Sequence, residues 1–125
     1  RDDPKRLRIL GDGTQRKAYI HVDDVLAAIL LVQEKVPGET KFDLFNVATD
    51  DYVTATEIAK MACEVAGLRP DAVRFDYTGG DRGWKGDVPQ VLFNVEKLKR
   101  LGWGARRTSG EALRDSMEAM RRETA

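Results

Sequence analysis

The segment Val25–Val32, with the sequence VLAAILLV, is the feature that most restricts how this chain can fold. A helix is predicted from the Asp23-Asp24 pair, where either carboxylate can cap its N-terminus, to about Lys35. Apolar side chains cover nearly every side of this helix, which is typical of a helix that is buried on more than one face. A chain of 125 residues builds a single core and has few elements with which to cover such a helix alone.

Composition and charge exclude several classes of protein. Apolar residues make up 42% and charged residues 34% of the sequence, as in a globular domain. The 21 basic and 21 acidic residues balance, so no charge favours nucleic acid or an anionic membrane as a partner. Cys63 is the only cysteine, which rules out an internal disulfide network, and no run approaches the roughly 18 apolar residues of a membrane span. We therefore expect a cytoplasmic protein, and the polar start RDDPKRLRI, which lacks methionine, suggests a piece of a longer one.

Local signals predict short strands and about four helices. The predicted strands are Arg6–Leu10, Lys17–Val22, Phe42–Ala48 and Ala72–Tyr77. The third carries apolar side chains on both faces, as a strand covered on both sides of an α/β sheet does. Beyond the first helix, caps are predicted at Thr54, Asn94 and Thr108, for helices that end near Ala66, Gly102 and Arg122. No internal repeat or linker is found, so the expected fold class is α+β, one small domain over residues 1–125.

The turn Gly11-Asp12-Gly13 could present backbone amides to a phosphate, as glycine-rich loops do. A dinucleotide-binding fingerprint, however, requires a strand, the spacing G-x-G-x-x-G and then a helix. In this chain a second predicted strand follows the turn, and Arg16 stands where the third glycine would be. We therefore expect a hairpin turn that joins the two strands.

His21, Asp23 and Asp24 could together form a metal site or an acid–base pair. His21 is the only histidine, no cysteine lies near it, and the two aspartates occupy the predicted helix cap. The favoured interpretation is therefore structural, and no metal site is expected.

The loop Thr78–Pro89, with the sequence TGGDRGWKGDVP, is the segment most suggestive of ligand binding. Five of its twelve residues are glycine or proline, so it can adopt backbone shapes that other residues resist. The same loop carries Asp81, Arg82, Trp84, Lys85 and Asp87. Arginine can bind a phosphate bidentately, tryptophan can cover a base or a sugar ring, and aspartate can accept hydrogen bonds from hydroxyl groups. Alternatively, the loop folds over its own tryptophan, and the residues alone leave both interpretations open.

No catalytic set is found. None of the three tyrosines is followed by a lysine four positions later, and the nucleophile-elbow, zinc-protease and P-loop patterns do not occur. On its residues alone, the chain offers a binding surface without catalytic residues.

Three segments occur in this order along the chain: GDGTQRKAYIHVDDV, FNVA and GDRGWKGDVPQVLFNVEKLKRLGW. Together they resemble the C-terminal half of the extended short-chain dehydrogenases, the NAD-dependent epimerase/dehydratase family that includes UDP-glucose 4-epimerases. The resemblance implies a substrate-binding domain of an α/β enzyme. The Rossmann domain, which would bind NAD and carry the catalytic Tyr-x-x-x-Lys pair, would lie outside this sequence. The implied partner is a UDP- or dTDP-linked nucleotide sugar, and the parent enzyme is expected to be a homodimer.

The resemblance also implies, position by position, a set of substrate-binding residues: Arg8, Ile9, Leu10, Lys17, Arg82, Trp84 and Asp87. The strand before the glycine turn would line the nucleotide base. Lys17 replaces the usual arginine that contacts the diphosphate, and Trp84 stands where a second arginine is usual, so that role is assigned to Arg82. Asp87 matches the aspartate that helps to hold the ribose or the loop.

The chemistry implied by the resemblance is transient hydride transfer between NAD and a carbon of the sugar, with tyrosine as the base. We expect this chain to bind the nucleotide end of the substrate and to have no catalytic residue of its own. Two alternatives stay open: a sugar-nucleotide 4,6-dehydratase domain, and a non-enzymatic module in which Val25–Val32 and Phe42–Ala48 serve oligomerisation.

Overall fold

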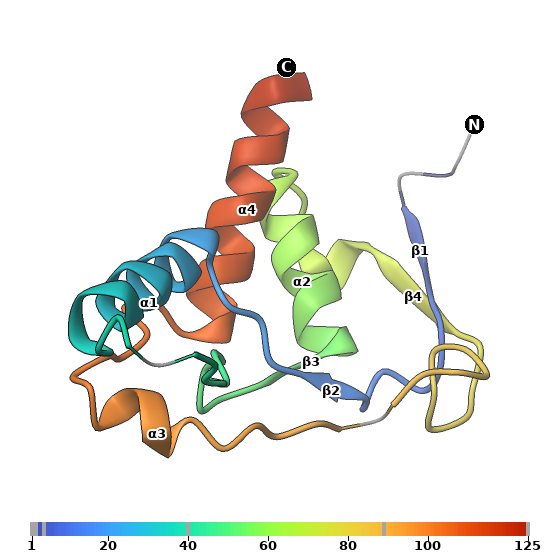
Figure 1. Cartoon of the computed structure of the whole chain (residues 1–125). Coiled ribbons are helices and arrows are strands. Elements are labelled where there is room, and N and C mark those ends of the chain that lie inside the picture. The colour runs from blue at the N-terminus through green and yellow to red at the C-terminus, as the bar shows by residue number, and fades with distance from the viewer. Residues whose placement is uncertain (1–2, 4, 40, 89, 125) are drawn as a thin grey trace.

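The computed structural model describes residues 3, 5–39, 41–88 and 90–124, which form four α-helices and four short strands (Figure 1). The helices are α1 Val22–Lys35, α2 Ala55–Val65, α3 Glu96–Lys99 and α4 Ser109–Thr124. The strands are β1 Arg6–Ile9, β2 Arg16–Lys17, β3 Val53–Thr54 and β4 Arg74–Tyr77, with a 3-10 turn at Pro70–Ala72 before β4. This composition agrees with the expected α+β class and with about four helices.

The strands form two separate two-stranded sheets. β1 pairs in parallel with β4, and β2 pairs antiparallel with β3. The expected hairpin at Gly11–Gly13 is therefore wrong, because β1 and β2 belong to different sheets. Gly11 donates its N–H to Thr78 Oγ1 at 2.8 Å and accepts from Gly79 N at 2.9 Å, so the turn is bonded to the chain that follows β4 and not to β2.

Two predicted strands differ from the structure. Lys17–Val22 is reduced to the pair Arg16–Lys17, since only these residues face a partner, β3. Phe42–Ala48 forms no strand, because none of the described residues supplies a neighbouring strand to bond with it. Phe42, which the strand prediction expects to be buried, is 81% exposed.

Two of the four predicted helix caps are confirmed, and those of α1 and α3 differ from the prediction. Thr54 and Thr108 each form a capping box, with Glu57 and Glu111 respectively. The cap of α1 is His21 and not an aspartate, because His21 Nδ1 accepts a hydrogen bond from Asp23 N at 3.2 Å. Asn94 acts one residue before the N-cap of α3, where its side chain accepts a hydrogen bond from Glu96 N.

Packing divides the molecule into two parts. α2 lies against α4 and against the β1–β4 sheet, whereas α1 joins α3 on the other side (Figure 1). A core of Ala28, Leu98 and Trp103 connects α1 to α3 and the turn after it. Only one face of α1 is covered by the described residues, and its apolar side chains Leu26, Ile29 and Leu30 are more than half exposed. No helix among the described residues is long and apolar enough to cross a membrane.

The core predicts a specific cost for truncating Leu98, which is fully buried. Leu98→Ala should lower the free energy of unfolding by about 2–5 kcal/mol, because it leaves a cavity beside Trp103. The exposed Leu92 is the matched control, and Leu92→Ala should change that free energy by less than about 0.5 kcal/mol. Urea denaturation followed by circular dichroism measures both, and equal effects would contradict this description of the core.

Candidate functional site

The loop after β4 folds back over the end of β1. Because the two strands are parallel, their carboxyl ends lie at the same edge, which is where ligands bind to parallel sheets. Thr78 N donates to Ile9 O at 3.0 Å, and the Thr78 hydroxyl accepts from Gly11 N. The glycine turn and the start of the loop are thereby held as one unit (Figure 1).

Gly11 is required by this close approach. Its φ of 81° is unfavourable for other residues, and a Cβ there would lie 2.8 Å from Gln15 Nε2 and 2.9 Å from Arg82 O. The loop also passes close to Leu10, since a Cβ on Gly83 would be 3.8 Å from Leu10 Cβ. The structure therefore brings the backbone at Arg82 against the strand end that the family resemblance assigns to the nucleotide base.

Lys17 and Asp87, both predicted site residues, form an ion pair. Lys17 Nζ lies 2.6 Å from Asp87 Oδ1 and also donates to Val88 O. The second carboxylate oxygen accepts from Gly83 N at 3.2 Å, and Asp87 N donates to Trp84 O at 3.0 Å. Lys17 first, and then the Gly83 amide, hold the pKa of Asp87 below its ordinary value.

The other predicted site residues differ in their solvent exposure and in their contacts. Ile9 is buried, and Leu10 is about half exposed. Trp84 is 67% exposed, and its ring lies against Gly86 of the same loop, so the contact of the loop with its own tryptophan leaves most of the ring uncovered. Among the described residues, Arg82 makes neither an ion pair nor a hydrogen bond. Its charge is available to a ligand.

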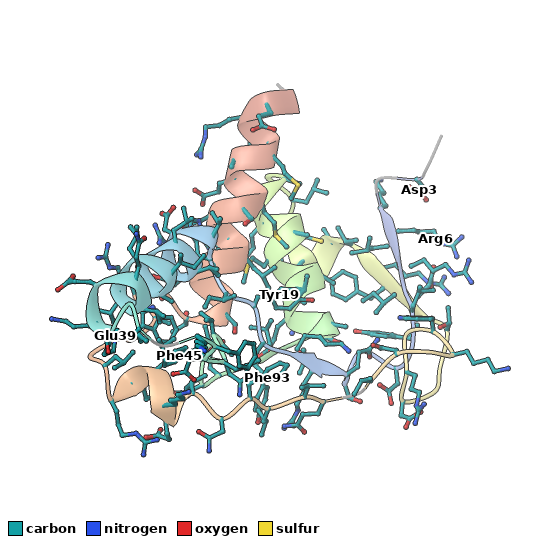
Figure 2. All side chains as sticks on the ribbon, in the orientation of Figure 1. Asp3, Arg6, Tyr19, Glu39, Phe45 and Phe93 are labelled. Carbon is teal, nitrogen blue, oxygen red and sulfur yellow. The ribbon has the colours of Figure 1, made fainter. Side chains whose placement is uncertain are left out.

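Arg8 faces a second part of the surface. It lines an open hollow of about 690 Å³ together with Arg6 and Asp76, and the loop residues Arg82 and Trp84 do not line it. Arg6 Nη2 and Arg74 Nε each lie 2.7 Å from the Asp76 carboxylate and lower its pKa, Arg6 more strongly. Figure 2 shows Arg6 pointing outward from this sheet. The structure thus divides the predicted site residues between the loop and this sheet face.

Gln15 is a residue that the sequence argument missed. Its Nε2 donates to Leu10 O at 2.5 Å, and its Oε1 is buried and has no hydrogen-bond partner among the described residues. Gln15 therefore connects the end of β1 to the loop, since its amide also lies close to Gly11 and Gly83. A polar residue two positions after a glycine turn is a weak sequence signal for such a role.

The histidine–aspartate cluster makes contacts that support the fold around α1. His21 caps α1, and Asp24 is buried, where its Oδ1 accepts from Arg106 N and its carbonyl accepts from Trp103 Nε1 at 3.1 Å. A search of the described residues finds no group of three or more His, Cys, Asp or Glu side chains that could hold a metal ion.

The glycine turn does not fit NAD. It leads into β2 and not into a helix, and its Gly11 and Thr14 amides are already bonded to Thr78 and Asp12. Asp12 also places a negative charge at the turn, and its bonds from the hydroxyl and amide of Thr14 lower its pKa. A pyrophosphate would meet this carboxylate where it requires free N–H groups.

The Lys17–Asp87 pair predicts a pH dependence. The pKa of Asp87 in the folded chain lies below its unfolded value of about 3.9, so the pair contributes stability above that value. This contribution is lost as the pH falls through the lower, folded pKa. The stability difference between wild type and Asp87→Asn, measured by urea denaturation, should therefore shrink between about pH 6 and about pH 2. A difference that stays constant over this range would contradict the prediction.

Comparisons with known proteins give the same family as the motifs. Residues 2–48 match the NAD dependent epimerase/dehydratase family. UDP-glucose 4-epimerase of Bacillus subtilis (strain 168) is 33% identical over 106 residues, which cover 84% of this chain and 30% of that protein. The crystal structure of Thermotoga maritima UDP-glucose 4-epimerase with UDP-glucose matches with a TM-score of 0.76 at 28% identity, covering 98% of this chain and 37% of that one. The structure of MoeE5 in complex with UDP-glucose and NAD matches with a TM-score of 0.74 at 30% identity, covering 97% of this chain and 38% of MoeE5.

The chain thus spans between 30% and 38% of the length of these three proteins. The similarity extends over most of its own residues in both sequence and structure, and it confirms the resemblance found in the motifs. The chain belongs to the NAD dependent epimerase/dehydratase family.

Proposed function

We propose that residues 1–125 are the nucleotide-sugar-binding domain of an NAD-dependent sugar-nucleotide epimerase similar to UDP-glucose 4-epimerase. The observation that carries this proposal is the attachment of the 78–88 loop to the end of β1. It brings the backbone of Arg82, a cation without an ion-pair partner among the described residues, against the glycine turn beside Leu10. A partly apolar strand edge suits a base, and a free guanidinium suits a diphosphate.

The roles of the single residues follow from their surroundings. Leu10 is about half exposed at the strand end, where it can contact a base, and the preceding Ile9 is buried. Arg82 is available for the diphosphate, and the exposed ring of Trp84 can cover a sugar. The carboxylate of Asp87 stays ionised and can accept a hydrogen bond from a ribose hydroxyl in addition to those from the chain.

Arg8 extends the proposed site onto the sheet face. Among the described residues it has no ion-pair partner, whereas its neighbours Arg6 and Arg74 share Asp76. Lys17 belongs to the site through its bond to Asp87. These residues bind and orient, and none of them is placed to transfer a proton or a hydride. The catalytic groups and NAD would come from the remainder of a homodimeric parent enzyme.

Titration with UDP tests the binding proposal. UDP should bind the wild-type chain, and Arg82→Ala should weaken the binding roughly ten-fold or more, because a charge-assisted contact to the diphosphate is lost. Arg122, an exposed arginine of α4 remote from the loop, is the matched control, and Arg122→Ala should bind UDP as the wild type does. Isothermal titration calorimetry gives the dissociation constants of both variants. Equal losses of UDP affinity in Arg82→Ala and Arg122→Ala would show that only the overall charge of the chain affects binding.

The chain by itself should not turn over substrate. With UDP-glucose and NAD added, no UDP-galactose should form above the background, because the chain contains no Tyr-x-x-x-Lys pair. Chromatographic separation of the two UDP-sugars after prolonged incubation measures this. Epimerisation that scales with the concentration of the chain would contradict the proposal.

An oligomerisation module is the second candidate, and one observation favours it. Leu26, Ile29 and Leu30 of α1 form an exposed apolar face, and Phe42 and Leu44 are also exposed. Concentration-dependent self-association in analytical ultracentrifugation, without UDP binding, would support this candidate over the first. A sugar-nucleotide 4,6-dehydratase domain is the other alternative, and a preference between UDP and dTDP does not separate it from an epimerase domain, because a relative from Arabidopsis thaliana is named a UDP-glucose 4,6-dehydratase.

A further inference from the structure

Both basic residues after the glycine turn are engaged within the chain. Arg16 donates to the Tyr52 hydroxyl at 2.8 Å, and its guanidinium lies over the Tyr52 ring, 4.7 Å from the centroid. Lys17 contacts the loop that follows β4 through Asp87 and Val88. Two adjacent cations thus have separate partners, of which only the partner of Lys17 belongs to the proposed binding loop.

The Lys17–Asp87 pair connects three places in the chain. Lys17 belongs to β2, Asp87 lies near the end of the loop, and its second oxygen accepts from Gly83 at the middle of the loop. The Asp87 side chain is only 10% exposed and that of Lys17 is 35% exposed, so water screens this pair less than an ordinary surface pair. The loop is therefore closed upon itself and fixed to β2 by a single carboxylate.

Lys17 has little capacity left for a ligand. An ammonium group has three N–H donors, and Asp87 Oδ1 and Val88 O already accept two of them. A diphosphate could recruit Lys17 fully only by displacing a carboxylate at 2.6 Å, whereas Arg82 in the same loop donates no hydrogen bond to any part of the chain that the structure describes. Binding of the diphosphate by Arg82 leaves the Lys17–Asp87 pair intact and so avoids the free-energy cost of breaking it.

We infer that Lys17 is a positioning residue, which holds the 78–88 loop closed over the end of β1 through Asp87, and that the diphosphate is bound by Arg82 and not by Lys17. This inference rests on the proposed function for its ligand. The closure of the loop is a property of the chain without any ligand, and it can be measured separately.

Limited trypsin digestion measures closure without nucleotide. Cleavage after Arg82 and Lys85, followed by mass spectrometry, should become roughly five-fold faster or more in Lys17→Met, because the loop opens more often. Arg16→Met is the matched control: it removes the adjacent cation, whose partner is Tyr52, and should leave this rate unchanged. Lys17→Met combined with Asp87→Asn should cleave no faster than the faster of the two single variants, since both remove the same contact.

Binding of uridine and of UDP, each followed by NMR titration, separates positioning from phosphate contact. A positioning Lys17 predicts that Lys17→Met weakens both ligands by the same factor, whereas Arg82→Ala weakens UDP alone. Loss of UDP affinity alone in Lys17→Met, with unchanged cleavage of the loop, would overturn the inference. If the wild type binds neither ligand, the proposed function fails, and unchanged cleavage in Lys17→Met would independently refute the loop closure.

Discussion

The parallel pairing of β1 with β4 is the constraint on which the rest of the site depends. Two parallel strands end at the same edge, so the chain that leaves β4 at Thr78 emerges beside the chain that leaves β1 at Gly11. Antiparallel pairing would place these ends at opposite edges and would separate the glycine turn from the loop. The apolar side of this sheet rests on α2, and α4 supports α2 from behind, so the edge has a rigid base.

Signals confined to a few neighbouring residues were predictable from the sequence. The capping boxes at Thr54 and Thr108 are complete within four residues, and both begin helices where predicted. The choice of strand partner was not predictable, because it depends on residues far away in the chain. Gly11–Gly13 has the composition of a hairpin turn, yet β1 bonds to a strand more than 60 residues later. Phe42–Ala48 has the composition of a covered strand, but the described residues supply no partner for it.

In the candidate site, too, the residue types could be read from the sequence, whereas the contacts between distant residues could not. Glycine content and the cluster of ionic groups around Trp84 made the loop a candidate binding segment, and these are local properties. The pairing of Lys17 with Asp87 spans 70 residues and becomes visible only when β2 and the loop are placed together. Gln15 was missed for a related reason: its importance comes from the two segments that it touches, and its sequence neighbourhood does not reveal it.

The two tryptophans have opposite environments, and this gives the molecule two internal optical reporters. Trp103 is 7% exposed and donates its indole N–H to the carbonyl of Asp24, whereas Trp84 is 67% exposed in the loop. A dissolved quencher such as iodide reaches an exposed indole and is kept from a buried one. The quenchable part of the fluorescence would therefore follow events in the loop, and the protected part would follow the core between α1 and α3. Motions of the loop and melting of the fold would then be distinguishable in a single unlabelled sample.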